Sequence, residues 1–245
     1  DDCSNDSSMA IIKSYCDERI IVIKNKENIG LAASLNKSIK LSNGEYLIRM
    51  DADDISEKNR IIEQVKFMDR NLSIGAAGSY FKLIGESIPW YKKIIIRKGT
   101  INQKDSSSKL LFSPCVLHPS VIIRKKILTE NNMFYNENFK RAQDYELWSR
   151  LIFVTEITNI PKVLFRWRIS GIQSSIKDRG KQIEYSRLIH KFILKKLIGQ
   201  EPSEQQLKIN QWIISQKILS NLELKELDAT LNNLITYTNS NIKIF

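Results

Sequence analysis

The feature that most constrains the fold is a strand, a helix and a second strand that follow one another near the start of the chain. "RIIVIKN" (Arg19 to Asn25) is a short apolar run bounded by charge, which predicts a buried strand. A helix is predicted from Leu31 to Leu41, followed by an Asn43-Gly44 turn and a strand from Glu45 to Met50. This order indicates parallel α/β layering.

Alternating elements continue to about residue 178. We expect Ser56 to cap a helix from Glu57 to Asn71, and the basic, polar stretch from Pro89 to Ser108 to be a mobile excursion. The other expected elements are strands at Ile74 to Gly85, His118 to Arg124 and Lys162 to Ile169, a helix from Asp144 to Phe153, and helices from Lys181 to near Tyr237. The predicted organisation is an α/β domain over residues 1–178 and a C-terminal helical extension over residues 179–245.

Composition narrows the class of protein. The 245 residues, 42% of them hydrophobic, suffice for one sizeable core. No apolar stretch approaches the roughly 18 to 20 residues of a membrane-spanning helix. Cys3, Cys16 and Cys115 are an odd number without CxxC spacing, which argues against a disulfide framework or a zinc site and favours a reducing cytoplasm. The formal charge of +11 suggests nucleic acid, an anionic membrane or a phosphorylated substrate as partner.

An acidic run, "RMDADD" at residues 49 to 54, directly follows the predicted strand that ends at Met50. In open α/β sheets, ligands bind at that edge. The crowded carboxylates of Asp51, Asp53 and Asp54 repel one another unless a cation or hydrogen-bond donors relieve them. Mg²⁺ or Mn²⁺ would do so, because hard cations bind carboxylates and share their coordination shell with substrate phosphates. A plain acidic turn is the alternative. In either case Asp54 is expected to help the next helix begin.

A second acidic feature is "RAQDYELWSRL", in which Asp144 stands at a predicted helix start. The simple explanation is structural, since aspartate is a good N-cap and favours the helix dipole. A functional role for this carboxylate is the alternative. The residues alone leave both explanations open.

Five segments, taken together and in order, resemble family 2 of the inverting glycosyltransferases, which have the GT-A fold. These are "DDCSND" (Asp1 to Asp6), "NKENIGLAASLNKSI" (Asn25 to Ile39), "GEYLIRMDADDIS…NR" (Gly44 to Arg60), "HPSVIIRK" (His118 to Lys125) and "QDYELWSRL" (Gln143 to Leu151). The resemblance implies a Rossmann-like mixed sheet flanked by helices. The family usually begins with a strand and a Pro-x-Tyr/Phe-Asn loop that this chain lacks, which implies an N-terminally truncated member without its first strand.

The resemblance also implies roles for individual residues. Asp2 resembles the ligand of the nucleotide base, with Asp1 beside it. Asp51 resembles the first acid of the D-x-D motif, near the ribose and the metal, and Asp53 the acid that binds the divalent cation, Mn²⁺ or Mg²⁺. Asp144 matches the catalytic base.

Further positions are assigned less directly. Asn28 falls in the segment that shapes the donor pocket. His118 is expected on the acceptor or diphosphate side, with a strand-end histidine satisfied by backbone as the alternative. Where many relatives place a histidine that assists the metal or diphosphate, this chain has Ser170.

The implied function is metal-dependent, inverting transfer of a sugar from a nucleotide-diphosphate donor to a saccharide or lipid-linked saccharide, in bacterial surface-polysaccharide synthesis. A GT-A-like remnant that binds nucleotide without catalysis is a second hypothesis. A basic nucleic-acid-binding module is a third, but no RRM, KH, helix-turn-helix or zinc-finger pattern supports it, so we expect no nucleic acid partner. The late helices are expected to pack on the core, to mediate a dimer, or to contact the anionic inner face of the cytoplasmic membrane through Lys181, Lys191, Lys195 and Lys196.

Overall fold

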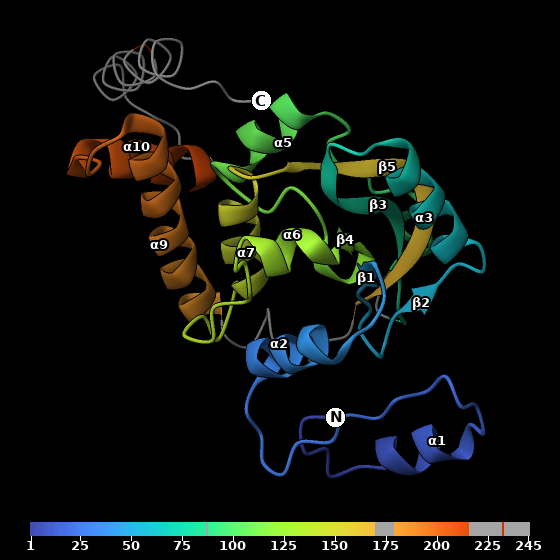
Figure 1. The fold of residues 1–245 in the computed structure, drawn as a ribbon. Helices are drawn as coiled ribbons and strands as arrows, with labels where there is room; N and C mark the ends of the chain where they lie inside the picture. Colours follow the sequence, from blue (N-terminus) through green and yellow to red (C-terminus); the bar gives the residue numbers. More distant parts are fainter. Residues whose placement is uncertain (87, 170–178, 216–231, 233–245) are drawn as a thin grey trace.

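A five-stranded mixed sheet organises the chain in the computed structural model, which describes residues 1–86, 88–169, 179–215 and 232 (Figure 1). The strands are β1 (Tyr46–Ile48), β2 (Ile55–Ser56), β3 (Ile74–Ile84), β4 (Ile122–Arg124) and β5 (Glu156–Arg168), in the spatial order β1-β4-β3-β5-β2. The central β3–β5 pair is parallel, and each of the other pairs is antiparallel. The predicted mixed α/β sheet is thereby confirmed.

Helices cover the two faces of the sheet unequally. The first face packs against α2 (Leu31–Leu41), α5 (Gln103–Leu110), α6 (Lys125–Glu130), α7 (Gln143–Leu151) and α9 (Arg179–Ile198). On the second face, Met68 from α3 (Arg60–Arg70) packs on Ala77 and Ile122. Neighbouring residues divide between the faces, since Ala76 and Ile123 belong to the first core, as period-2 alternation in a strand requires. The other helices in the described ranges are α1 (Ser8–Ser14), α4 (Trp90–Ile94), α10 (Glu204–Ser215) and the 3₁₀ turn η1 (His118–Ser120).

The strand predicted from Arg19 to Asn25 is absent, and this prediction was wrong. Residues 1–30 lie apart from the sheet, beyond α2 (Figure 1), and the side chain of Ile21 is 76% exposed. An apolar run becomes a strand only if a neighbouring strand accepts its hydrogen bonds. Here the described neighbour is Asp1, whose amino group donates to the Ile23 carbonyl oxygen and whose own carbonyl oxygen accepts from Asn25 N.

Several predicted boundaries also shift. Ser56 does not cap a helix, because Ile55 and Ser56 pair with β5, and α3 begins only after Asn59. The stretch predicted as a mobile excursion contains α4 and α5, the latter capped by the Asn102 side chain, which accepts from Asp105 N. The start of the strand predicted at His118 is instead the 3₁₀ turn. The end of the predicted late helical region and Ser170 lie outside the described residues.

Candidate active site

The acidic run forms a turn between β1 and β2, as Asp54 N donates to the Asp51 carbonyl oxygen at 3.3 Å. Arg49, at the end of β1, pairs with Asp51 through both guanidinium nitrogens, at 2.6 Å from Nη1 to Oδ2 and 2.5 Å from Nη2 to Oδ1. The Arg49 side chain is only 12% exposed. A two-pronged, charge-assisted pair of this kind is strong and holds both side chains in one geometry. The carboxylate predicted to lie near ribose and metal therefore has an internal countercharge.

Asp53 is oriented differently from its neighbours. Its side chain is exposed, and no hydrogen bond or ion pair engages its carboxylate within the described part of the chain. Its backbone carbonyl oxygen accepts from Arg168 Nε at 2.6 Å. The last turn of the acidic loop is thus held by the end of β5, while the Asp53 carboxylate stays available to a ligand.

Asp54 does not begin a helix, contrary to the sequence-based expectation. Its Oδ1 accepts from Arg168 N at 2.8 Å, and its Oδ2 is buried without a partner. Burial raises the pKa of Asp54 to about 6, the Arg168 backbone hydrogen bond opposes this, and the charges of Asp53 and Asp51 add to it. Asp54 therefore fixes the acidic turn to the end of β5.

The residues fit a divalent cation through Asp53 alone. Among the described residues, no group of three or more His, Cys, Asp or Glu side chains is placed to hold a metal ion. Mg²⁺ commonly uses one or two carboxylates and completes its shell with waters and substrate phosphates. Asp53 satisfies that requirement, whereas Asp51 would first have to release Arg49.

Asp144 stands in the first turn of α7, where the sequence analysis places it. The helix begins after Ala142, which adopts a left-handed conformation with φ of 56°. Burial raises the pKa of Asp144, while the Tyr145 backbone and the positive charge of Arg49 lower it and the charge of Asp51 raises it. The two predicted acidic features therefore converge on Arg49, although they are far apart in sequence.

His118 is a buried, neutral histidine. Its Nε2 lies 2.7 Å from the Tyr135 hydroxyl oxygen, and its ring meets that of Trp148 edge-on at 6.0 Å. Burial and the positive charge of Arg49 hold the pKa of His118 well below its ordinary value. The partner of His118 is therefore a side chain rather than the backbone that the alternative explanation named.

Asp2, Asp1 and Asn28 form a compact group ahead of α2. Asp2 Oδ1 accepts from Ile29 N at 2.9 Å and Asn25 Nδ2 at 3.0 Å, and Asp2 Oδ2 accepts from Gly30 N at 2.9 Å. Burial acts to raise the pKa of Asp2, but these hydrogen bonds outweigh it and lower the pKa. Asn28 Nδ2 donates to the Asp2 carbonyl oxygen, and Asp1 Oδ1 accepts from Ser4 N.

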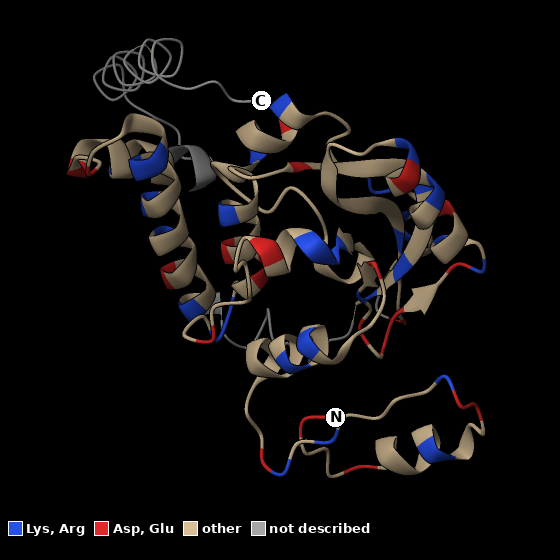
Figure 2. Cartoon of the chain, in the orientation of Figure 1, with Lys and Arg blue, Asp and Glu red and all other residues tan. Residues whose placement is uncertain are grey.

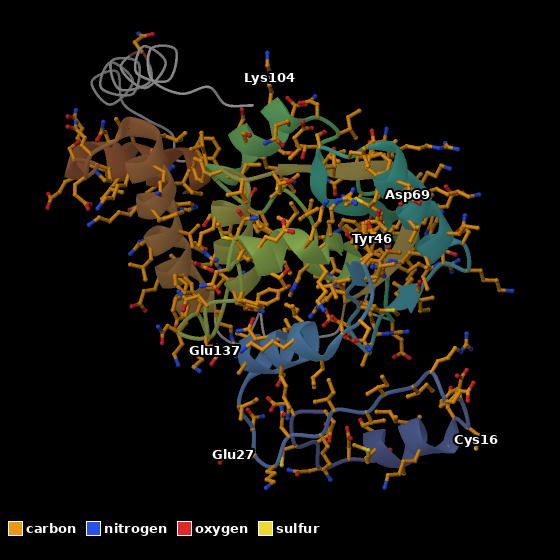
Figure 3. The ribbon with its side chains drawn as sticks, in the orientation of Figure 1. Cys16, Glu27, Tyr46, Asp69, Lys104 and Glu137 are labelled. Atoms are coloured by element: carbon orange, nitrogen blue, oxygen red, sulfur yellow. The ribbon has the colours of Figure 1, made fainter. Side chains whose placement is uncertain are left out.

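A cavity of about 270 Å³ lies between the start of α2 and the loop that leads into α7. Asn28, Gly30 and Ala33 line one side, and Glu137, Arg141 and Gln143 line the other. Glu137 lies beside α2 (Figure 3), where its Oε1 accepts from Asn36 Nδ2 at 3.0 Å. Asn28 and the residue before Asp144 thus face the same space.

Arg49 and Arg60, to which the sequence alone gave no role, hold the residues around the acidic turn in place. Arg60 is 1% exposed and donates from Nη2 to the carbonyl oxygens of Arg49 and Pro119, at 2.8 and 3.0 Å. Burial lowers the pKa of Arg60 to about 10. In the sequence, Arg60 could have been noticed as a cation of an amphipathic helix next to the acidic run. Arg49 could have been noticed as a cation two positions before Asp51.

Solved structures identify the class of fold. S. aureus TarS 1–349 in complex with UDP-GlcNAc superposes with a TM-score of 0.60 and 16% identity, covering 97% of this chain and 70% of that one. The mannosyltransferase PcManGT of Pyrobaculum calidifontis, solved with GDP-Man and Mn²⁺, gives 0.59 and 14% over 99% of this chain and 65% of that one. The chain has the GT-A fold of these glycosyltransferases, as the resemblance implied.

Sequence comparison gives the family. The family described as glycosyl transferase family 2 matches residues 1–131, so the chain belongs to this family. An uncharacterized glycosyltransferase of Haemophilus influenzae is 32% identical over 181 residues, which are 72% of this chain and 56% of that protein. TuaG of Bacillus subtilis, a putative teichuronic acid biosynthesis glycosyltransferase, is 26% identical over 155 residues, which are 62% of this chain and 58% of that protein. The chain therefore spans little more than half the length of these relatives.

Proposed function

We propose that this protein transfers a sugar from a nucleotide-diphosphate donor to an acceptor hydroxyl, with inversion at the anomeric carbon and dependence on Mn²⁺ or Mg²⁺. The observation that supports the proposal is that Arg49 pairs with Asp51 of the acidic turn and that its positive charge also acts on Asp144. The Asp53 carboxylate faces solvent and has no protein partner among the described residues, and that of Asp144 is partly buried with a raised pKa. The two carboxylates therefore suit opposite tasks.

Asp53 is assigned to the leaving group. Departure of a nucleoside diphosphate from sugar C1 builds negative charge on phosphate, and a bound divalent cation neutralises that charge without a proton. Asp53 would hold the cation, because its carboxylate is exposed and free of protein partners among the described residues. Arg168 and Asp54 keep the Asp53 backbone in place from β5.

Asp144 is assigned to the acceptor. An acceptor hydroxyl must lose its proton as its oxygen attacks C1, and a positioned carboxylate contributes typically 10² to 10⁴-fold to the rate of such a step. The new C–O bond forms on the face opposite the breaking bond to phosphate, so the anomeric configuration inverts. The proton passes to Asp144, whose pKa is raised by burial, so that its carboxylate is a stronger base than an exposed one.

The donor nucleotide is assigned to the cavity beside α2, which Asn28 lines together with residues just before Asp144. Asp1 and Asp2 stand next to it, and we propose that they contact the base. The hydrogen bonds that Asp2 accepts from Ile29 N and Gly30 N fix the entry to α2 and hence the wall of the cavity.

Known proteins support the donor class and the setting. TarS was solved with UDP-GlcNAc, and PcManGT with GDP-Man and Mn²⁺. The relative TuaG is named for teichuronic acid biosynthesis. We propose a saccharide or lipid-linked saccharide as acceptor, in the assembly of a bacterial surface polysaccharide on the cytoplasmic side of the membrane.

The test combines nucleotide binding with transfer. Nucleoside diphosphates and nucleotide sugars are screened by thermal shift with and without Mn²⁺, and the stabilising donor is then used in transfer assays with Asp53→Asn, Asp144→Asn and the exposed control Glu130→Gln. Loss of metal-dependent donor binding in Asp53→Asn, and loss of transfer with retained binding in Asp144→Asn, is expected. Near-normal transfer by both variants would overturn the mechanism, and metal-dependent nucleotide binding without hydrolysis or transfer would favour the non-catalytic remnant.

A further inference from the structure

A short segment after β3 exposes large apolar side chains next to one another. It comprises residues 89–98 and includes α4; we call it the α4 segment. Trp90 is 75% exposed, Tyr91 50%, Ile94 63%, and Ile95 and Ile96 43% each. Contiguous exposed apolar residues on a soluble surface mark an interaction site, whereas isolated ones need no explanation.

The same segment is strongly cationic. Lys92, Lys93, Arg97 and Lys98 lie within it, and no Asp or Glu occurs from residue 88 to residue 104. Within the described ranges, none of these four cations forms an ion pair. Elsewhere Lys and Arg are interspersed with Asp and Glu over most elements (Figure 2). The α4 segment therefore combines positive charge with apolar surface.

The backbone of the α4 segment is fixed to the sheet. Arg97 N donates to the Phe81 carbonyl oxygen at 2.8 Å, and Phe81 N donates to the Arg97 carbonyl oxygen at 3.1 Å. Lys92 N donates to the Pro89 carbonyl oxygen at 2.9 Å, and the rings of Trp90 and Tyr91 meet edge-on at 6.2 Å. The apolar side chains are thus presented to solvent from an anchored backbone.

The late helix offers a weaker surface of this kind. In α9, Ile189, Ile193 and Leu194 are buried in the core. Lys191 and Lys195 both lie next to Glu201, which offsets part of their charge. Although α9 also exposes Ile183 and Leu188, at 47% and 52%, two of its cations are offset by Glu201, whereas no ion pair in the described ranges offsets the cations of the α4 segment.

We propose that the α4 segment is a docking surface for an anionic lipid bilayer. Trp and Tyr favour the membrane–water interface, isoleucines bury apolar area below the headgroups, and Lys and Arg attract anionic lipid. Each basic residue near such a surface strengthens binding about fivefold. A second copy of the chain would bring an equally cationic surface to this one and be repelled, so charge complementarity selects the bilayer.

Docking there would connect the bilayer to the proposed acceptor side. Ile96, Arg97 and Lys98 line a cavity of about 510 Å³ together with Lys109, Cys115 and Leu117, and Leu117 directly precedes His118 in the sequence. This connection rests on the proposed function, but lipid binding itself does not and is measured without donor or acceptor.

The experiment is vesicle flotation of the purified protein, using phosphatidylcholine vesicles with and without phosphatidylglycerol at low and high salt. We expect salt-sensitive binding to the anionic vesicles only. Lys92→Gln/Lys93→Gln should weaken it more than tenfold, and Trp90→Ser/Ile94→Ser should abolish it.

Matched controls carry the same changes elsewhere: Lys58→Gln/Lys126→Gln at exposed lysines, and Leu72→Ser at a leucine that is 78% exposed. Both controls and Lys191→Gln/Lys195→Gln should bind like the parent protein, and circular dichroism checks the fold of each variant. Absence of binding to anionic vesicles, or equal losses in the controls, would overturn the proposal. So would a change of oligomeric state by size-exclusion chromatography in the α4 variants, which would assign the surface to a second copy.

Discussion

Arg49 holds Asp51 in a two-pronged ion pair, at 2.6 and 2.5 Å, and its positive charge also reaches Asp144 and His118. One largely buried cation therefore acts on the carboxylate proposed for the donor side and on the carboxylate proposed as base. Asp51 has this internal countercharge, whereas Asp53 has none among the described residues.

The first prediction separates Asp53 from Asp51. Asp53→Asn should abolish Mn²⁺-dependent stabilisation by a nucleoside diphosphate, because its carboxylate is the one without a protein partner in the described chain. Asp51→Asn should weaken it less, since Arg49 already occupies that carboxylate. Thermal shift with and without Mn²⁺ measures both, and equal effects of the two variants would contradict the assignment.

A second prediction concerns the pH dependence of transfer. Asp144 must be ionised to act as base, so activity falls as pH drops through its pKa. Arg49→Gln removes a positive charge that lowers this pKa, so the acid limb of kcat/KM should move up by about one pH unit. Arg49→Lys keeps the positive charge, so its acid limb should lie close to that of the parent protein. Arg70→Gln, on the exposed surface, should leave the profile unchanged. An unmoved acid limb in Arg49→Gln would contradict the proposed coupling.

A third prediction concerns stability. The pKa of Asp54 is raised from 3.8 to about 6 in the folded state, so ionisation of Asp54 opposes folding. The folded protein is therefore more stable while Asp54 is protonated, and this stability is lost as pH rises through 6. Asp54→Asn should therefore raise the free energy of unfolding by about 1–3 kcal/mol at pH 7.5 and by much less near pH 4. Urea unfolding in EDTA at both pH values tests this, and Glu130→Gln, at an exposed carboxylate, is the control. A gain of equal size at both pH values would point to a cause other than ionisation.

A fourth prediction concerns Arg60. Arg60→Met should destabilise the fold by about 2–4 kcal/mol, because it leaves the buried carbonyl oxygens of Arg49 and Pro119 without their donor. The exposed Arg70→Met should cost little. Chemical unfolding of both variants decides, and similar midpoints would show that Arg60 contributes no more than a surface cation.

Local pattern was sufficient for much of the fold. Leu31–Leu41 is a helix with the predicted bounds, and β3 and α7 lie within a residue or two of theirs. These segments carry their own periodicity or capping signals, and their apolar faces find partners in the two cores. Residues 19–25 have the same apolar signal, yet they form no strand, since pairing depends on a neighbour that local sequence does not reveal.

Long-range contacts were the part of the site that could not be predicted. Local pattern placed Asp53 just after a strand and Asp144 at a helix start, and in the structure they lie in the turn after β1 and in the first turn of α7. Nothing in "RMDADD" shows that Arg49 pairs with Asp51, or that Asp54 accepts from Arg168 N across 114 residues of sequence. Tyr46 from β1 likewise meets Asp69 of α3 (Figure 3), a contact that only the packed fold creates.

The left-handed residue Ala142 has a consequence for how this site can vary. A single backbone conformation, with φ of 56°, sets the direction in which the chain enters α7 and therefore where Asp144 points. Glycine and asparagine tolerate that conformation, whereas β-branched residues do not. A substitution at Ala142 that changes this conformation would therefore move the carboxylate proposed as base without replacing it.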